Sequence, residues 1–79
     1  MTEQQIQSKK IKELESDGYY VIKLIQTNKN GIPDLLALKA DEPPLFVEVK
    51  TSGGRLAKLQ EYRIKELKKI GFRAEIYRG

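Results

Sequence analysis

Apolar residues recur near the start of the chain at the spacing of a helix, and the pattern predicts one over residues 3–16. This segment contains helix-forming residues and neither glycine nor proline, and Thr2 and Gln5 have the spacing of a capping box. Gly18 is expected to end the helix. The inner stripe of the helix would consist of Ile6, Ile11 and Leu14, with Glu3 in the middle of it.

Short apolar runs, many of their residues aromatic or β-branched, predict three strands, and an alternating segment near the end of the chain predicts a fourth. They are expected at residues 19–25, 34–39, 45–50 and 72–77. Asn30 and Gly31 suit a turn with positive φ between the first two strands, and Pro33 is expected to precede the second strand because it cannot donate a ladder hydrogen bond. Short connections join the first three strands, which should therefore form an antiparallel meander.

A second helical pattern covers residues 56–70, after a glycine-rich loop and before Gly71. Its apolar stripe is Leu56, Leu59, Ile64, Leu67 and Ile70, with Lys58, Lys65, Lys68 and Lys69 directed away from it. A helix of this length would place the last strand parallel to the third. The sequence thus predicts an α/β fold of order α-β-β-β-α-β, with a mixed four-stranded sheet flanked by helices, in a single domain over residues 1–79.

Composition limits the chemistry that such a domain can perform. The 79 residues include no cysteine and no histidine, which excludes disulfides, thiolate nucleophiles, imidazole bases and nearly every zinc site. A chain of this size buries only about 60% of the surface that its unfolded form exposes, so a partner subunit is plausible. The chain has no apolar stretch of membrane-spanning length and no signal-peptide pattern, which favours a soluble, cytoplasmic protein.

Positive charge is concentrated in the C-terminal third. The formal net charge is +4, and the segment from Arg55 to Gly79 holds eight lysines and arginines against three glutamates. Such an excess suits a polyanion such as DNA, because binding releases counterions from the phosphates. A solvated basic helix face is the alternative explanation.

Charged residues are normally rare in strands, and three of those in the predicted strands could share one site: Asp34, Glu48 and Lys50. Glu48 and Lys50 are two positions apart, so their side chains leave the sheet on one face, and a neighbouring strand can bring Asp34 beside them. Two carboxylates and an ammonium can hold a divalent cation and orient a water molecule. Each residue also has an ordinary explanation: a turn aspartate for Asp34, a cross-strand salt bridge for Glu48 and Lys50.

Both helices carry a polar residue within their apolar stripe, Glu3 in the first and Gln60 in the second. A buried carboxylate is costly unless it is paired or bound to a metal, although either residue could lie at the edge of its stripe and reach solvent. On a helical wheel Glu3 lies ~20° from Leu14, whereas Glu13 points to solvent and Glu15 lies at the margin. Glu3 is therefore the preferred first-helix carboxylate, with Glu15 in reserve.

Taken together, these segments resemble the VRR-NUC (virus-type replication-repair nuclease) domain, a family of the PD-(D/E)xK nuclease superfamily, over essentially the whole chain. The resemblance rests on Gly31-Ile32-Pro33-Asp34-Leu35, on Phe46-Val47-Glu48-Val49-Lys50, and on the loop leading to Leu56 and Gln60. It implies a restriction-endonuclease-like core in which Asp34 and Glu48 bind Mg²⁺ or Mn²⁺. Lys50 and Gln60 would be catalytic, and Glu3 would be the first-helix glutamate.

The function expected on this basis is a metal-dependent DNA endonuclease with little sequence specificity, selective for branched or four-way-junction DNA. The main-chain carbonyl of Val49 would join the metal ligands, and Arg55, Lys58 and Arg63 would hold the DNA backbone. Lone minimal members of this kind resemble homodimeric endonucleases associated with phage, so the resemblance implies a homodimer in a bacterial or phage-infected cell, without an organic cofactor.

Two functions from other classes are consistent with the same charge pattern. One is a DNA-binding module without chemistry, and the other is a small subunit of a larger DNA-processing complex. The acidic residues argue against both, because acids facing a phosphate backbone weaken binding unless a cation intervenes. A pure binding module would hold DNA equally well in EDTA.

Overall fold

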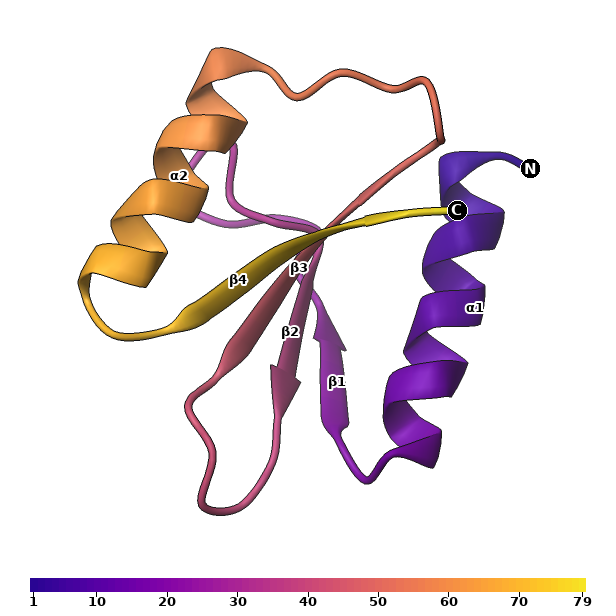
Figure 1. The fold of residues 1–79 in the computed structure, drawn as a ribbon, viewed down its shortest axis with the longest axis vertical. Helices are drawn as coiled ribbons and strands as arrows, with labels where there is room; N and C mark the ends of the chain where they lie inside the picture. The colour runs from indigo at the N-terminus through magenta and orange to yellow at the C-terminus, as the bar shows by residue number, and fades with distance from the viewer.

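The structure, a computed structural model, describes all 79 residues as two helices and one sheet (Figure 1). In chain order the elements are α1 (Glu3–Ser16), β1 (Tyr20–Lys23), β2 (Leu35–Leu38), β3 (Leu45–Lys50), α2 (Lys58–Lys69) and β4 (Arg73–Arg78). The predicted α/β class and the order α-β-β-β-α-β are confirmed. Neither helix is long and apolar enough to cross a membrane.

The strands lie in the order β1-β2-β3-β4. β1 pairs antiparallel with β2, β2 antiparallel with β3, and β3 parallel with β4, as the short and long connections predict. One row of directly opposed residues runs across the sheet: Ile22, Leu36, Phe46 and Ala74. Because opposed residues share a face, this row marks the side on which α2 packs.

Helix α1 covers one face of the sheet and is capped as the sequence predicts. The Thr2 hydroxyl accepts the N–H of Gln5 at 3.2 Å, and the Gln5 side chain accepts the N–H of Thr2 at 2.9 Å. Gly18 has a φ of +91° after the helix, a conformation that favours glycine. The core under α1 consists of Ile6, Leu14, Leu35, Ala37, Leu45, Val47 and Val49.

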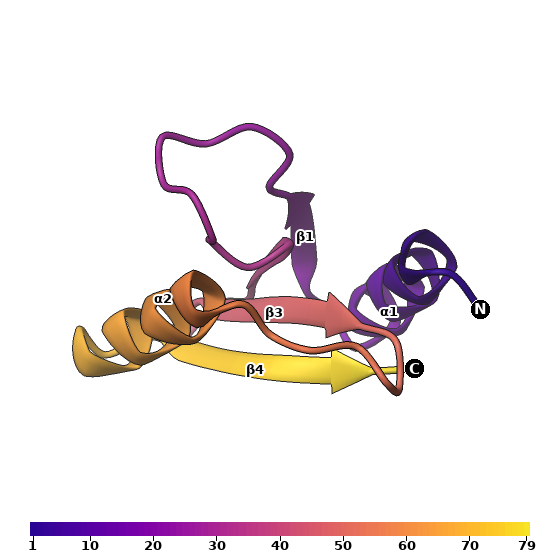
Figure 2. The same ribbon diagram turned by 90° about the horizontal axis from the view of Figure 1, so that it is seen from above.

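Helix α2 packs on the other face, over the part formed by β3 and β4 (Figure 2). The core there is smaller and consists of Ile64, Leu67 and Ala74, with Ile32, Phe46 and Leu56 packed against it. The β1 side of this face is uncovered, so Tyr20 is 72% and Ile22 38% exposed. An apolar region of the sheet thus remains open beside α2.

The exact limits of several elements differ from those predicted. The first strand is shorter than residues 19–25, because the chain leaves the sheet into a long loop after Lys23. The second strand starts at Leu35 rather than Asp34, where the chain bends. The second helix is Lys58–Lys69, and the last strand is Arg73–Arg78 instead of 72–77. Each difference lies at an end, where hydrogen bonding rather than periodicity sets the limit.

The predicted stripe of α2 was too wide. Leu59 and Ile70 are 42% and 62% exposed, because α2 lies over one side of the sheet and only the face with Ile64 and Leu67 meets it. Tyr19 and Tyr77 pack against the α1 core, whereas Tyr62 and Phe72 are exposed. The four outward lysines of the second helix are exposed as predicted.

Lys10 is a buried polar residue on the inner face of α1 that was not among the predicted site or core residues. Its ammonium lies 3.0 Å from a carboxylate oxygen of Glu13, 3.9 Å from one of Glu75, and 4.4 Å from the centre of the Tyr77 ring. Two carboxylates and an aromatic face compensate for its removal from water. Its i, i+4 spacing from Ile6 and Leu14 was the available sequence signal.

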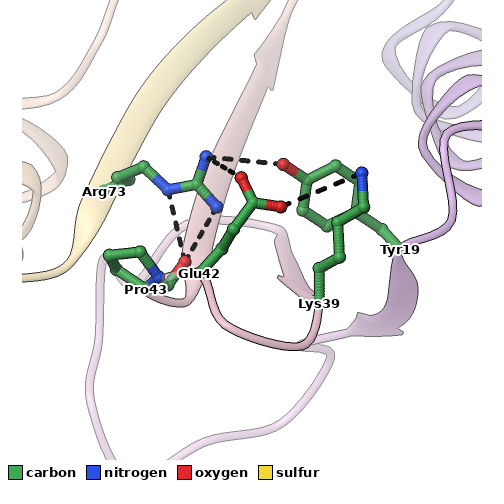
Figure 3. A network of polar contacts seen from close by, with 5 residues as sticks. All are labelled: Tyr19, Lys39, Glu42, Pro43 and Arg73. Carbon is green, nitrogen blue, oxygen red and sulfur yellow. Dashed lines mark hydrogen bonds and ion pairs between the residues drawn. The ribbon is translucent and has the colours of Figure 1, made fainter.

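A polar network fixes the end of the sheet where β3 and β4 begin (Figure 3). Arg73 donates to the carbonyl of Pro43 through Nε at 3.2 Å and Nη2 at 2.8 Å, and its Nη1 lies 3.7 Å from a Glu42 oxygen. Lys39 lies 3.8 Å from the other oxygen of Glu42 and 4.7 Å from the Tyr19 ring centre. These contacts join the β2–β3 connection to β4. The opposite end of the strands takes no part in this network.

Candidate active site

Asp34 and Glu48 face each other at the end of the sheet opposite the Arg73 network. Leu35 pairs with Val47, so one further step of the antiparallel register places Asp34 opposite Glu48. Asp34 lies at the bend just before β2, and its Oδ2 accepts the main-chain N–H of Val49 at 2.8 Å. The side chain therefore takes over a bond that the backbone would make if the ladder continued.

Glu48 is buried without full hydrogen bonding. Its side chain is 2% exposed, and its Oε1 has no hydrogen-bond partner. Burial is the main cause that raises the pKa of Glu48 to about 8; the hydrogen bond with Asp34 and the negative charge of Asp34 add to it. Lys50 lowers the pKa in opposition, and Glu3 raises it slightly further. Without a cation, Glu48 is therefore largely protonated at neutral pH.

Lys50 completes the group of three. It lies two residues after Glu48 on β3, and its Nζ is 3.9 Å from Oε2 of Glu48. The Lys50 side chain is 13% exposed, which restricts its ammonium to the immediate surroundings of the carboxyl pair. The predicted convergence of Asp34, Glu48 and Lys50 is therefore present in the structure.

A cleft of about 760 Å³ lies beside Asp34. Its lining is formed by Asp34, Gln60 and the loop residues Leu24, Ile25, Gln26, Thr27, Asn28, Lys29, Asn30, Gly31 and Ile32. The Oε1 of Gln60 accepts the N–H of Ala57 at 2.9 Å, which caps the start of α2. The side-chain NH₂ group of Gln60 remains available to the cleft. Gln60 thus combines a capping role with a place in the wall of the site.

The first-helix glutamates occupy different surroundings. Glu3 is exposed, contrary to the expectation that it lies within the buried stripe, because the first turn of α1 lies level with the end of the sheet (Figure 1). Its charge nevertheless contributes to the raised pKa of Glu48. Glu13 is bound to Lys10, and Glu15 is exposed. No three acidic side chains are close enough together to form a complete metal cluster, so Asp34 and Glu48 are the paired carboxylates.

The three basic residues predicted to hold DNA differ in their surroundings. Arg55 and Lys58 are exposed, in the loop before α2 and at its first residue. Arg63 donates through Nε to the carbonyl of Asn30 at 2.9 Å and through Nη1 to Glu66 at 3.0 Å. Arg63 therefore connects α2 with the loop between β1 and β2, a role that the sequence did not indicate.

The main-chain carbonyl of Val49 is directed to the β2 side of β3. Gly79 donates to the carbonyl of Lys50, so that carbonyl points to the β4 side, and carbonyls of consecutive strand residues alternate in direction. The residue opposite Val49 in the continued register is Pro33, which has no N–H. The ladder therefore supplies no backbone donor from Pro33 to the Val49 carbonyl.

Comparison with known protein families gives a match over the whole chain. The family model for the VRR-NUC domain matches residues 1–79. Neither the curated proteins nor the solved structures include a match to the chain.

Proposed function

Because the chain belongs to the VRR-NUC family, within the PD-(D/E)xK nuclease-like group, we propose that it is a divalent-metal-dependent DNA endonuclease. Nuclease activity on DNA is the activity of the family. The observation that carries the proposal is the buried pair of Asp34 and Glu48, in which one Glu48 oxygen has no partner. A divalent cation would satisfy this oxygen and allow Glu48 to ionise beside Asp34, because the cation compensates the two negative charges.

The donor set fits a hard cation. Asp34, Glu48 and the Val49 carbonyl supply only oxygen atoms, which suits Mg²⁺ or Mn²⁺. When bound, the ion would lower the pKa of a water molecule and neutralise negative charge on the scissile phosphate. Glu48 would lose its proton on binding, since carboxylates ligate in their ionised form. No organic cofactor is required for this reaction.

Lys50 and Gln60 would act on the reacting groups. Lys50 is held beside Glu48, where its ammonium can orient the attacking water or stabilise charge on the phosphate. The side-chain NH₂ of Gln60, whose oxygen is committed to Ala57, can donate a hydrogen bond to a phosphate oxygen. Glu3 would contribute at longer range, by adding negative charge near Glu48.

The DNA backbone would contact exposed cations near the start of α2. Arg55 and Lys58 lie there without side-chain partners in the protein. Arg63 would contribute mainly by holding the loop that lines the cleft, with its remaining donors available to phosphate. Such contacts position DNA without reading bases, which is consistent with selection of branched structures such as four-way junctions rather than sequences.

We further propose that the protein is a homodimer that acts in the cytoplasm of a bacterial or phage-infected cell. The uncovered apolar residues Tyr20 and Ile22 on the edge strand β1 support a self-complementary interface. Two copies would supply two active sites, one for each of two strands.

A metal-dependent cleavage assay tests the nuclease proposal. Duplex, flap, single-stranded and four-way-junction DNA would be incubated with the protein in Mg²⁺, in Mn²⁺ and in EDTA. Cleavage that requires a metal and is lost in Lys50→Ala but kept in Lys65→Ala, an exposed lysine of α2, is the expected result. A module that only binds DNA would hold each substrate equally well in EDTA and cleave none.

A further inference from the structure

The loop between β1 and β2, residues 24–34, forms one wall of the cleft at the candidate active site. Figure 2 shows this loop projecting away from the sheet after β1. Three of its side chains carry neutral amides, on Gln26, Asn28 and Asn30, and Lys29 is its one cation. The loop therefore presents hydrogen-bonding groups of both kinds immediately beside Asp34.

Several contacts hold this loop in a defined shape. Leu24 donates its N–H to the carbonyl of Asp34 at 2.8 Å, which closes the base of the loop. The Thr27 hydroxyl accepts the N–H of Lys29 at 3.2 Å and donates to the Lys29 carbonyl at 2.9 Å. Arg63 of α2 holds the far side through the carbonyl of Asn30. A loop held at its base, its tip and its far side is preorganised for binding.

Gly31 allows the loop to approach α2 closely. Its φ is +80°, and a Cβ at this position would lie 2.7 Å from Cγ of Leu59. Only glycine combines this backbone conformation with such a close approach. Leu59, which is partly exposed on α2, thus supports the loop rather than the core.

Among the apolar residues of the loop, only Ile25 is exposed, since Leu24 and Ile32 are half-buried and Pro33 is buried. Ile25 is 80% exposed, more than any other large apolar side chain in the protein, and it lines the cleft. The core gains nothing from an apolar side chain in this position. Aliphatic side chains inserted between base pairs are a known means by which proteins unstack and bend DNA.

We propose that the β1–β2 loop is a DNA-binding element in which Ile25 inserts into the base stack at a branch point. The amide side chains of Gln26, Asn28 and Asn30 contact the nucleotides that this insertion exposes. The cost of unstacking is lowest where pairing is already interrupted, so the wedge selects branched DNA over continuous duplex. This inference rests on the proposed nuclease function and assigns its structural selectivity to one side chain.

The test combines a binding signal with a cleavage ratio. Wild type, Ile25→Ser and Ile25→Leu would be mixed with a four-way junction carrying 2-aminopurine at the branch point, with Ca²⁺ replacing Mg²⁺. The fluorescence of 2-aminopurine rises when the base unstacks. Cleavage of the junction and of a continuous duplex would then be compared in Mg²⁺. Ile70→Ser is the matched control, because Ile70 is also exposed, at 62%, and lines no part of the cleft.

We expect Ile25→Ser to lose most of the fluorescence rise and to reduce the ratio of junction to duplex cleavage about tenfold, the effect of losing one buried aliphatic contact. Ile25→Leu and Ile70→Ser should behave as wild type. An Ile25→Ser protein with an unchanged fluorescence rise and an unchanged cleavage ratio would overturn the inference. An equal loss of junction cleavage and duplex cleavage in Ile25→Ser would also overturn it. If wild type cleaves nothing in any metal, the nuclease proposal fails, and the fluorescence still decides whether Ile25 unstacks the branch.

Discussion

The Oδ2 of Asp34 accepts the main-chain N–H of Val49 at 2.8 Å, across the point where β2 leaves β3. This bond holds the carboxylate that precedes β2 against the strand that carries Glu48 and Lys50. The Asp34 carboxylate takes the place of the strand carbonyl that would otherwise accept the Val49 N–H, and Pro33 has no N–H to donate to the Val49 carbonyl, so the strands can separate. The same bond therefore ends the pairing of β2 with β3 and positions the acidic pair.

Asp34 should accordingly have a structural role that can be separated from its proposed catalytic one. In Asp34→Asn the amide oxygen can still accept the Val49 N–H, so the free energy of unfolding should stay close to wild type while metal-dependent cleavage is lost. In Asp34→Ala that N–H loses its acceptor, which should cost about 1–2 kcal/mol. Urea unfolding and cleavage rates measure the two effects.

Asp17→Ala serves as the control, because Asp17 is exposed at the end of α1. Equal stability of Asp34→Ala and Asp34→Asn would show that the bond to Val49 contributes nothing.

Glu48 should make the stability of the metal-free protein depend on pH. Its pKa is raised by burial from 4.5 to about 8, so between these values the folded chain binds more protons than the unfolded chain. The contribution of protonated Glu48 to the free energy of unfolding is complete below pH ~4.5 and is lost as the pH rises from there to about 8. The loss should be roughly 2–3 kcal/mol, because the folded protein relaxes around the charged carboxylate and so reduces its cost. Denaturant unfolding at a series of pH values in EDTA measures it.

Glu48→Gln should be nearly flat over the same pH range. Calorimetry of Mg²⁺ or Mn²⁺ binding to wild type at pH 7, in two buffers of different ionisation enthalpy, should report release of close to one proton. Stability that rises from pH 5 to 8 in EDTA would contradict a buried, protonated Glu48.

The exposed cations near α2 should affect DNA affinity, and Arg63 should also affect stability. Arg55→Ala and Lys58→Ala should each weaken binding to all DNA structures severalfold and reduce the salt dependence by about one counterion. Arg63→Ala should additionally lower the melting temperature, because it releases the Asn30 carbonyl and Glu66.

Lys69→Ala, at the opposite end of α2, is the control for this series. Binding isotherms at three or more salt concentrations provide the measurement. A salt slope unchanged in both Arg55→Ala and Lys58→Ala would remove these residues from the interface.

The sequence was sufficient to predict the element order, the sheet topology and the acidic pair. The period of a strand places Glu48 and Lys50 on one face, and Pro33 marks where β2 begins. Convergence of Asp34 with Glu48 follows from the short connection between β2 and β3, which fixes an antiparallel register.

The surroundings of the helices could not be predicted in the same way. A helical wheel identifies the face with most apolar residues but not how much of the sheet lies beneath it, so Leu59 and Ile70 were placed in the core and Glu3 within the stripe. Lys10 was missed because its burial depends on Glu75 and Tyr77 of β4, more than sixty positions away. The anchoring of Asn30 by Arg63 likewise depends on two distant segments.

A change at the uncovered part of the sheet should report on the proposed dimer. Ile22→Glu places a charge in the row Ile22, Leu36 and Phe46, at a side chain that is 38% exposed and therefore tolerant of substitution. If this surface is the interface, burying an unpaired carboxylate there should raise the dissociation constant at least tenfold. Light scattering at micromolar concentration measures the mass.

Ile70→Glu is the control for the dimer test, since Ile70 is exposed on α2. A wild-type protein that is monomeric with and without DNA would end the homodimer proposal. A dimer that Ile22→Glu leaves intact would place the interface elsewhere.

Glu3 should be the first-helix carboxylate that influences the site, although it is exposed. Its negative charge contributes to the raised pKa of Glu48, whereas Glu13 is bound to Lys10 and Glu15 has no such effect. Glu3→Gln should therefore weaken Mn²⁺ binding and slow cleavage by up to about tenfold, as expected for a supporting residue outside the ligand set. Its position in the first turn of α1 also favours a negative charge, so the substitution should lower the free energy of unfolding by only about 0.3–1 kcal/mol. Glu15→Gln is the matched control, and calorimetry, cleavage rates and thermal unfolding are the measurements. A purely structural Glu3 would show the small stability change with normal Mn²⁺ affinity, and an inactive Glu15→Gln beside a normal Glu3→Gln would transfer the role to Glu15.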